Sequence, residues 1–156
     1  MLGQLNLNEI EELLRNQVVG RLGCHADGRT YVVPIAYAYE ADAVMAHSTD
    51  GLKLQMMREN PNVCFEVDSM GDLSNWRSVI AWGRFEELRG AEADRAMAQL
   101  VARFAPLAAT LESSHSPKDL THQHRAQTEG LPSVVYRIRL TEKTGRFETQ
   151  TTRQRT

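Results

Sequence analysis

The chain has 156 residues, 42% of them hydrophobic, and a formal net charge of −2 at pH 7. This length suits one domain with a sizeable core, which we expect over residues 1–148, followed by a polar tail over 149–156. A charge so near zero does not favour nucleic acid or an anionic membrane as a partner, and no apolar run approaches the ~20 residues that span a bilayer. The first residues include acidic side chains and no basic leader, so we expect no secretory signal and a cytoplasmic protein.

The N-terminal part predicts a helix followed by a hairpin. Asn8 is a typical N-cap with Glu11 three residues later, and apolar residues at helical spacing follow. A strand is expected over Val18–His25. The pair Asp27-Gly28 is a strong hairpin signal, because glycine accepts a positive φ at no steric cost.

The next stretch, YVVPIAYAYEADAVMAHSTDGLK over residues 31–53, is the one around which we expect the chain to be organised. Tyr31–Tyr39 and Ala43–His47 have the composition of strands, and a short polar break of hairpin length separates them. Pro34 has no N–H for a strand ladder. It therefore marks an edge, a bulge, or a place where a ligand lies beside the strand.

The end of this stretch has the composition of a phosphate-binding turn. Ser48, Thr49, Gly51 and Lys53 stand where a strand meets a helix, and the N–H groups that begin a helix are unpaired and favour an anion. Hydroxyl groups donate hydrogen bonds and the lysine adds positive charge. The alternative is that Ser48, Thr49 and Asp50 are ordinary N-cap residues and Lys53 is a solvated helix lysine.

The second half of the chain predicts further strands and one long helix. We expect a helix from Gly51 to Glu59, a polar loop over 69–75, a bulge or close backbone approach at Gly83, and a helix over Ala91–Phe104 that Pro106 ends. Strands are expected over 62–68, 77–89 and 133–140. Residues 105–133 form a long connection, typical of a functional lid or a mobile loop. Together these elements predict a mainly β fold with α additions, an antiparallel barrel with helices.

The cysteines, histidines and tryptophans are the side chains with distinctive chemistry. Cys24 and Cys64 are expected to be buried thiols rather than a disulfide. The histidines at 115, 122 and 124 lack the spacing of a zinc site, so no metal is predicted. Trp82 is expected in the core, and Trp76 beside a polar loop is the better stacking candidate.

Several short segments follow one another in a recognisable order: VGRL (19–22), YVVPIAY (31–37), HS with GLK (47–53), RENPNVCF (58–65), WRSV (76–79) and TGR (144–146). This ordered set resembles the pyridoxamine 5'-phosphate oxidase-like, FMN-binding split-barrel superfamily. Within it, the likeness is greatest to small flavin-nucleotide-binding proteins that include the nitroimidazole-resistance reductases. The resemblance implies a six-stranded antiparallel split barrel that forms a homodimer and holds FMN at the subunit interface.

The resemblance also implies roles for particular residues. The strand whose backbone faces the flavin ring would contain Val32, Val33, Pro34, Ile35 and Tyr37. His47 and Ser48 would lie near the flavin and its phosphate, and Lys53 would bind the phosphate. The residues that approach the ring or its tail, from the same or the partner subunit, would be Trp76, Arg77 and Ser78.

The function that follows is FMN-dependent electron transfer to a small organic acceptor, with a nitroaromatic compound as one option. His47 would then orient the ring or supply a proton. The alternatives are a flavin carrier or sensor without turnover, and haem or a deazaflavin in place of FMN. The substrate residues of authentic pyridoxamine phosphate oxidases are not recognisable, so vitamin B6 synthesis is not predicted.

Overall fold

The structure is a computed structural model that describes residues 1–112 and 133–150. Its strands are β1 (Leu2–Gln4), β2 (Val19–Ala26), β3 (Arg29–Ala36), β4 (Ala38–Glu40), β5 (Ala43–Thr49), β6 (Asn62–Asp72), β7 (Asn75–Glu87) and β8 (Ser133–Glu148). Its helices are α1 (Leu7–Asn16), α2 (Leu52–Glu59) and α3 (Gly90–Glu112). None of these helices is both long enough and apolar enough to cross a membrane.

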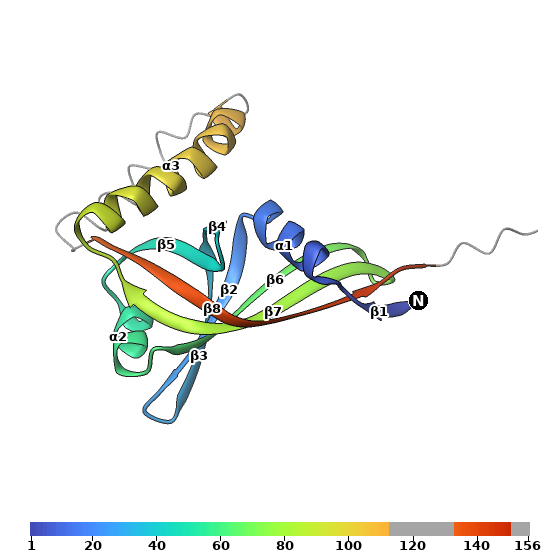
Figure 1. Ribbon diagram of the computed structural model, residues 1–156, viewed down its shortest axis with the longest axis horizontal. Helices are drawn as coiled ribbons and strands as arrows, with labels where there is room; N and C mark the ends of the chain where they lie inside the picture. The colour runs from blue at the N-terminus through green and yellow to red at the C-terminus, as the bar shows by residue number, and fades with distance from the viewer. Residues whose placement is uncertain (113–132, 151–156) are drawn as a thin grey trace, which may run out of the picture.

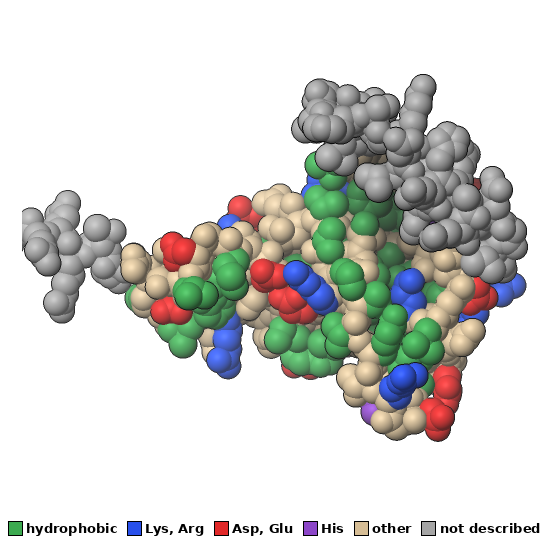
Figure 2. Space-filling model, turned by 180° about the vertical axis from the view of Figure 1, so that it is seen from behind, with side chains coloured by type: hydrophobic (Ala, Val, Ile, Leu, Met, Phe, Trp, Pro, Cys, Tyr) green, Lys and Arg blue, Asp and Glu red, His purple; other side chains and the backbone are tan. Residues whose placement is uncertain are grey.

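The strands form one antiparallel sheet in the order β3-β2-β6-β7-β8-β5-β4, with β1 added to β8 (Figure 1). The path is open, because no ladder joins β3 to β4 within the described residues. Seen from behind, hydrophobic side chains stay visible along the strands below α3 (Figure 2). The predicted mainly β, antiparallel class is confirmed, with eight strands in place of six because β1 and β4 are short three-residue additions.

The predicted hairpins form as two-residue turns with a positive φ at both central residues, although Ala41 is of a type that rarely adopts it. Asp27 and Gly28 join β2 to β3 with φ of 50° and 71°. Ala41 and Asp42 join β4 to β5 with φ of 49° and 60°. A positive φ at both central residues matches the twist of an antiparallel pair, which is why two-residue turns are sufficient here.

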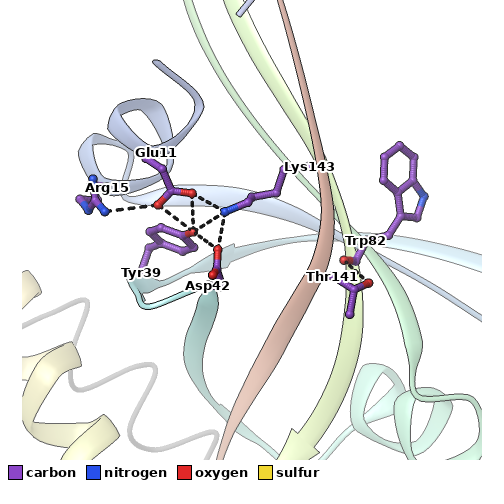
Figure 3. A network of polar contacts seen from close by, with 7 residues as sticks. All are labelled: Glu11, Arg15, Tyr39, Asp42, Trp82, Thr141 and Lys143. Atoms are coloured by element: carbon purple, nitrogen blue, oxygen red, sulfur yellow. Dashed lines mark hydrogen bonds and ion pairs between the residues drawn. The ribbon is translucent and has the colours of Figure 1, made fainter. Parts of the chain in front are cut away.

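The predicted bulge at Gly83 is also confirmed. The β7–β8 register shifts between Trp82 and Gly83, and a Cβ at Gly83 would overlap the carbonyl oxygen of Arg139. Beside this shift the Thr141 hydroxyl donates to the Trp82 carbonyl at 3.3 Å (Figure 3). Only glycine lets the two backbones approach so closely at this point.

Two boundary predictions near the N-terminus and the β6–β7 connection are wrong. The N-cap of α1 is Asn6, whose side chain accepts from the Glu9 N–H at 3.1 Å, so the capping box begins two residues before Asn8. The buried Leu5, whose N–H donates to Gly145 at 3.0 Å, fixes the chain just before this cap. The polar stretch over 69–75 is mostly strand, because the β6–β7 ladder continues to the tip of the hairpin.

The sequence predicted that Pro106 would end the third helix, and this prediction is wrong. Proline removes one intrahelical donor, yet α3 continues to Glu112. The expected long connection over 105–133 therefore starts as helix, and its remainder over 113–132 lies outside the described residues. Of the predicted polar tail, Thr149 donates to the Met1 carbonyl at 2.9 Å, and residues 151–156 also lie outside the described part.

A polar network on one side of the sheet joins α1, the β4–β5 turn and β8 (Figure 3). The Lys143 ammonium, only 14% exposed, donates to Glu11 and Asp42, and to the Tyr39 hydroxyl at 3.2 Å. Arg15 adds a contact to Glu11 at 3.3 Å. Burial raises the pKa of Tyr39 to about 12, so this hydroxyl remains a donor at neutral pH. The network ties together segments that are more than a hundred residues apart.

The main core contains two fully buried tyrosines with different polar surroundings. The Tyr37 hydroxyl donates to the Leu14 carbonyl at 2.7 Å, and its ring meets the edge of Phe65 with centroids 4.9 Å apart. The Tyr136 hydroxyl has no hydrogen-bond partner among the described residues. A buried polar atom without a partner carries the full cost of leaving water.

These two tyrosines make a matched prediction. Tyr37→Phe should lower the free energy of unfolding by about 1 kcal/mol, because it leaves the Leu14 carbonyl without its donor. Tyr136→Phe should leave that free energy unchanged or raise it, because it removes an unpaired hydroxyl and keeps the ring. Urea titration of the wild type and both variants checks this. An equal loss in the two variants would contradict the assignment.

Candidate functional site

A cleft of about 810 Å³ opens between the sheet and α3, within the size range of ligand sites. Its sheet side is made by the ends of β3 and β5 and the start of α2, at Pro34, Ile35, Ala36, His47, Ser48, Thr49 and Lys53. Its other wall is the face of α3 that carries Met97, Leu100, Val101, Phe104 and Ala105. The cleft thus has a polar, partly cationic end and an apolar wall.

Lys53 supplies the positive charge of this cleft. The side chain is half-buried, and burial lowers the pKa of its ammonium, an effect that nearby Cys24 partly opposes. No carboxylate of the described residues lies within salt-bridge distance of it. A desolvated cation without a counter-ion is the arrangement that an anionic ligand completes.

The first turn of α2 adds to this anion-favouring end. Its N-cap is Gly51, which offers no side-chain hydrogen bond, and no acidic residue lies in the first turn. The N–H groups there keep their free, positively polarised ends. Ser48 and Thr49 lie in β5, and Asp50 pairs with Arg58, so none of the three is the N-cap that the sequence offered as an alternative.

His47 and Ser48, at the end of β5, both line the cleft. His47 is exposed, and its Nε2 shares a hydrogen bond with the Ser133 hydroxyl of β8. Ser48 is 9% exposed and its hydroxyl donates to the Thr49 carbonyl at 2.8 Å. The tertiary fold therefore places the predicted histidine and serine beside Lys53.

The residues of the strand predicted to face a flavin ring lie in three places: the cleft, the surface and the core. Pro34 and Ile35 line the cleft. Pro34 also lies on β3, an edge strand of the sheet, so this proline is both at an edge and at a place where a ligand could lie beside the strand. Val32 is 63% exposed on the outer face of the sheet. Val33 packs against the core and Tyr37 is fully buried in it, so their side chains do not line the cleft.

The second predicted segment lies elsewhere in this chain. Trp76, Arg77 and Ser78 belong to the start of β7 and do not line the cleft. The Trp76 indole N–H donates to the Glu148 carboxylate at 3.2 Å. Trp82 is 40% exposed, so its expected core position is wrong. Because successive side chains of a strand point to opposite faces, and Ala81 and Gly83 on either side are buried, the indole of Trp82 faces outward.

The residues that sequence reasoning missed are those of α3. Met97, Leu100 and Phe104 recur at helical spacing and form an apolar face of α3 that lines the cleft. Val101, which also lines the cleft, is apolar yet 60% exposed. Periodicity predicts that a face is apolar and says nothing of whether a ligand or a protein covers it.

The described residues hold no candidate metal site. Within residues 1–112 and 133–150, no three His, Cys, Asp or Glu side chains group so as to hold a metal ion. The histidines at 115, 122 and 124 lie outside the described residues. Both cysteines are free thiols, as predicted, with Cys24 buried and Cys64 half-buried.

Comparison with known proteins identifies the family of this chain. A family model described as pyridoxamine 5'-phosphate oxidase matches residues 6–147. The crystal structure of a FAD-binding protein from Mesorhizobium loti is 30% identical with a TM-score of 0.76, covering 96% of this chain and 98% of that one. That of a proposed 5-nitroimidazole antibiotic resistance protein from Bacteroides thetaiotaomicron is 19% identical with a TM-score of 0.68, covering 94% and 87%.

A curated relative, an uncharacterized protein from Rhizobium meliloti, is 36% identical over 70 residues. That match covers 45% of this chain and 46% of the relative, so the chain spans just under half of the relative's length. The family model, in contrast, runs from the cap of α1 almost to the end of β8. The chain therefore belongs to the pyridoxamine 5'-phosphate oxidase family and has its FMN-binding split-barrel fold.

Proposed function

We propose that this chain binds FMN in the cleft between the sheet and α3 and acts as an oxidoreductase that passes electrons from a reduced donor to a small organic acceptor. The observation that carries the proposal is the half-buried Lys53 ammonium, which faces the cleft with no carboxylate partner among the described residues. Family membership and the FAD-binding relative from Mesorhizobium loti support a flavin as the ligand.

The two ends of the cleft fit the two ends of FMN. Its phosphate carries about two negative charges, which Lys53 and the uncapped start of α2 can neutralise. Its ring is flat and largely apolar, and Pro34 at the edge of the sheet leaves space where no further strand pairs. When bound, the flavin supplies hydride and electron transfer, and the protein binds, orients and tunes it.

The first prediction concerns the phosphate contact. Lys53→Ala should weaken FMN binding by about tenfold or more, because it removes a charge-assisted contact. Because burial lowers the pKa of Lys53, the ammonium loses its proton at a lower pH than a free lysine does. FMN affinity of the wild type should therefore fall as the pH rises through that lowered pKa, and the variant should lack this fall.

Fluorescence titration with FMN between pH 7 and pH 10 measures both effects. Riboflavin, which has no phosphate, is the control ligand, and its affinity should be the same in the wild type and in Lys53→Ala. Unchanged FMN affinity in the variant would remove Lys53 from the site.

The second prediction separates an enzyme from a carrier. The visible spectrum of the purified protein, with release and mass identification of the chromophore, distinguishes FMN from FAD, a deazaflavin or haem. NADH or NADPH should then bleach the bound flavin without oxygen, and an acceptor such as a nitroaromatic compound should restore it. A flavin that stays oxidised with every donor tested would favour the carrier or sensor function instead.

His47 is the residue we assign to proton supply in this reaction. Its ring lies at the cleft, and its bond to Ser133 fixes the ring's orientation. His47→Ala should slow restoration of the oxidised flavin by roughly 100-fold while FMN affinity stays near that of the wild type. If the oxidised flavin is restored at the same rate in the variant and the wild type, His47 does not supply the proton.

We also propose that the functional unit is a homodimer with the cofactor at the subunit interface. The outer face of the sheet exposes Val32, Ile80 and Trp82 at 63%, 41% and 40%, an apolar set that a second copy would bury. Trp76, Arg77 and Ser78 lie away from the cleft of their own chain. In the proposed dimer, these residues of one subunit would approach the cofactor in the cleft of the other.

A fourth functional prediction follows from that face. Trp82→Glu should convert the dimer to a monomer, because it places a charge in the centre of the buried apolar set. Sedimentation velocity measures the mass of the wild type and the variant. Leu7→Glu, at a residue of α1 that is 63% exposed, is the matched control and should keep the mass of the wild type. A monomeric wild type would exclude the dimer.

A further inference from the structure

Arg58, near the end of α2, holds two carboxylates at once. Its Nη1 donates to both oxygens of Asp50, at 2.9 Å and 3.1 Å. Its Nε and Nη2 donate to the two oxygens of Glu87, at 3.2 Å and 3.0 Å. These pairs raise the pKa of Arg58 and lower that of Glu87, so the charges are permanent at physiological pH. We call this group the Arg58 clamp.

The position of Asp50 gives the clamp its importance. Asp50 stands directly before Gly51, the N-cap of α2, and three residues before Lys53. Aspartate is among the preferred residues at a helix N-terminus, where its carboxylate accepts from free N–H groups. Within the described part of this protein no side chain caps those N–H groups, and Asp50 pairs with Arg58 rather than with Lys53.

We propose that Arg58 is a positioning residue that holds the Asp50 carboxylate away from the anion-binding end of the cleft and so keeps Lys53 and the start of α2 available to a phosphate. This inference deepens the proposed function and rests on it. Released from Arg58, the Asp50 carboxylate would pair with Lys53 or cap α2. In either position it would compete with a ligand phosphate and repel it.

Glu87 explains why arginine suits this position. It is the last residue of β7, and it takes one side of the guanidinium while Asp50 takes the other. A planar fork that is fixed on one side by a carboxylate has only one orientation toward the second. A lysine has no such fork, so Arg58→Lys should hold Asp50 less well than the wild type does.

The test compares FMN with riboflavin on four proteins by fluorescence titration. Arg58→Ala should weaken FMN binding roughly tenfold and leave riboflavin binding unchanged, because only FMN has a phosphate. Adding Asp50→Asn to Arg58→Ala should restore FMN affinity to within about twofold of the wild type. Glu87→Gln, which leaves the Asp50 pair in place, should keep FMN affinity within about twofold of the wild type.

Two outcomes would overturn the proposal. If the double variant binds FMN as weakly as Arg58→Ala does, then Arg58 supports the local fold and does not control Asp50. If Glu87→Gln loses as much FMN affinity as Arg58→Ala, the rigidity of the whole clamp matters and the charge of Asp50 does not. Thermal unfolding of each variant identifies any general loss of stability.

A readout without flavin separates this inference from the proposed function. In the flavin-free protein, NMR titration of Lys53 should give a higher pKa in Arg58→Ala than in the wild type, because a carboxylate that pairs with an ammonium stabilises its charged form. Asp50→Asn in the same background should reverse the rise. If the wild type fails to bind FMN, the proposed function fails, and the Lys53 titration still decides the role of Arg58.

Discussion

The backbone ladder along β8 is the constraint on which the rest of the structure depends. This strand pairs with β7 over Tyr136–Glu148, with β5 over Ser133–Arg139 and with β1 over Arg146–Glu148. Over residues 136–139 and 146–148 the strand is paired on both edges, and it cannot slip by one residue without turning its side chains to the wrong face. The close approach of β7 and β8 at Gly83, where a Cβ would overlap the Arg139 carbonyl oxygen, fixes this register further.

The cleft follows from that register. Pairing of β5 with the start of β8 places His47 beside Ser133, and the chain leaves β5 directly into the turn that begins α2. The helix α3 leaves the end of β7 and rests on β4, β5 and β8 through a second apolar cluster that includes Ala96 and Leu100. Apolar side chains of the same helix, Leu100 among them, also form the wall of the cleft that contains Lys53.

Charge is arranged so that, within the described part of the chain, the cation at the cleft has no carboxylate partner. Lys143 is surrounded by Glu11, Asp42 and Tyr39, and Arg58 pairs with both Asp50 and Glu87. Lys53, in contrast, pays for its partial burial without a carboxylate among the described residues. A protein gains no stability from such an arrangement, which is typical of a site whose missing charge comes from a ligand.

The sequence by itself determined the elements whose signals are local. Asp27-Gly28 predicted a hairpin, the helix expected from Gly51 to Glu59 forms as α2, and Gly83 predicted a bulge, because turns, caps and close approaches depend on residue types within a few positions. The same signals predicted a mainly β, antiparallel fold, and the family resemblance added the split barrel and the expected roles of His47, Ser48 and Lys53. Only the tertiary structure decided that Lys143 pairs with Glu11, that the Trp82 side chain faces outward, that α3 forms a wall of the cleft and that Asp50 pairs with Arg58. Each of these depends on strands that meet across long stretches of chain, and periodicity cannot show which polar groups or apolar faces will meet there.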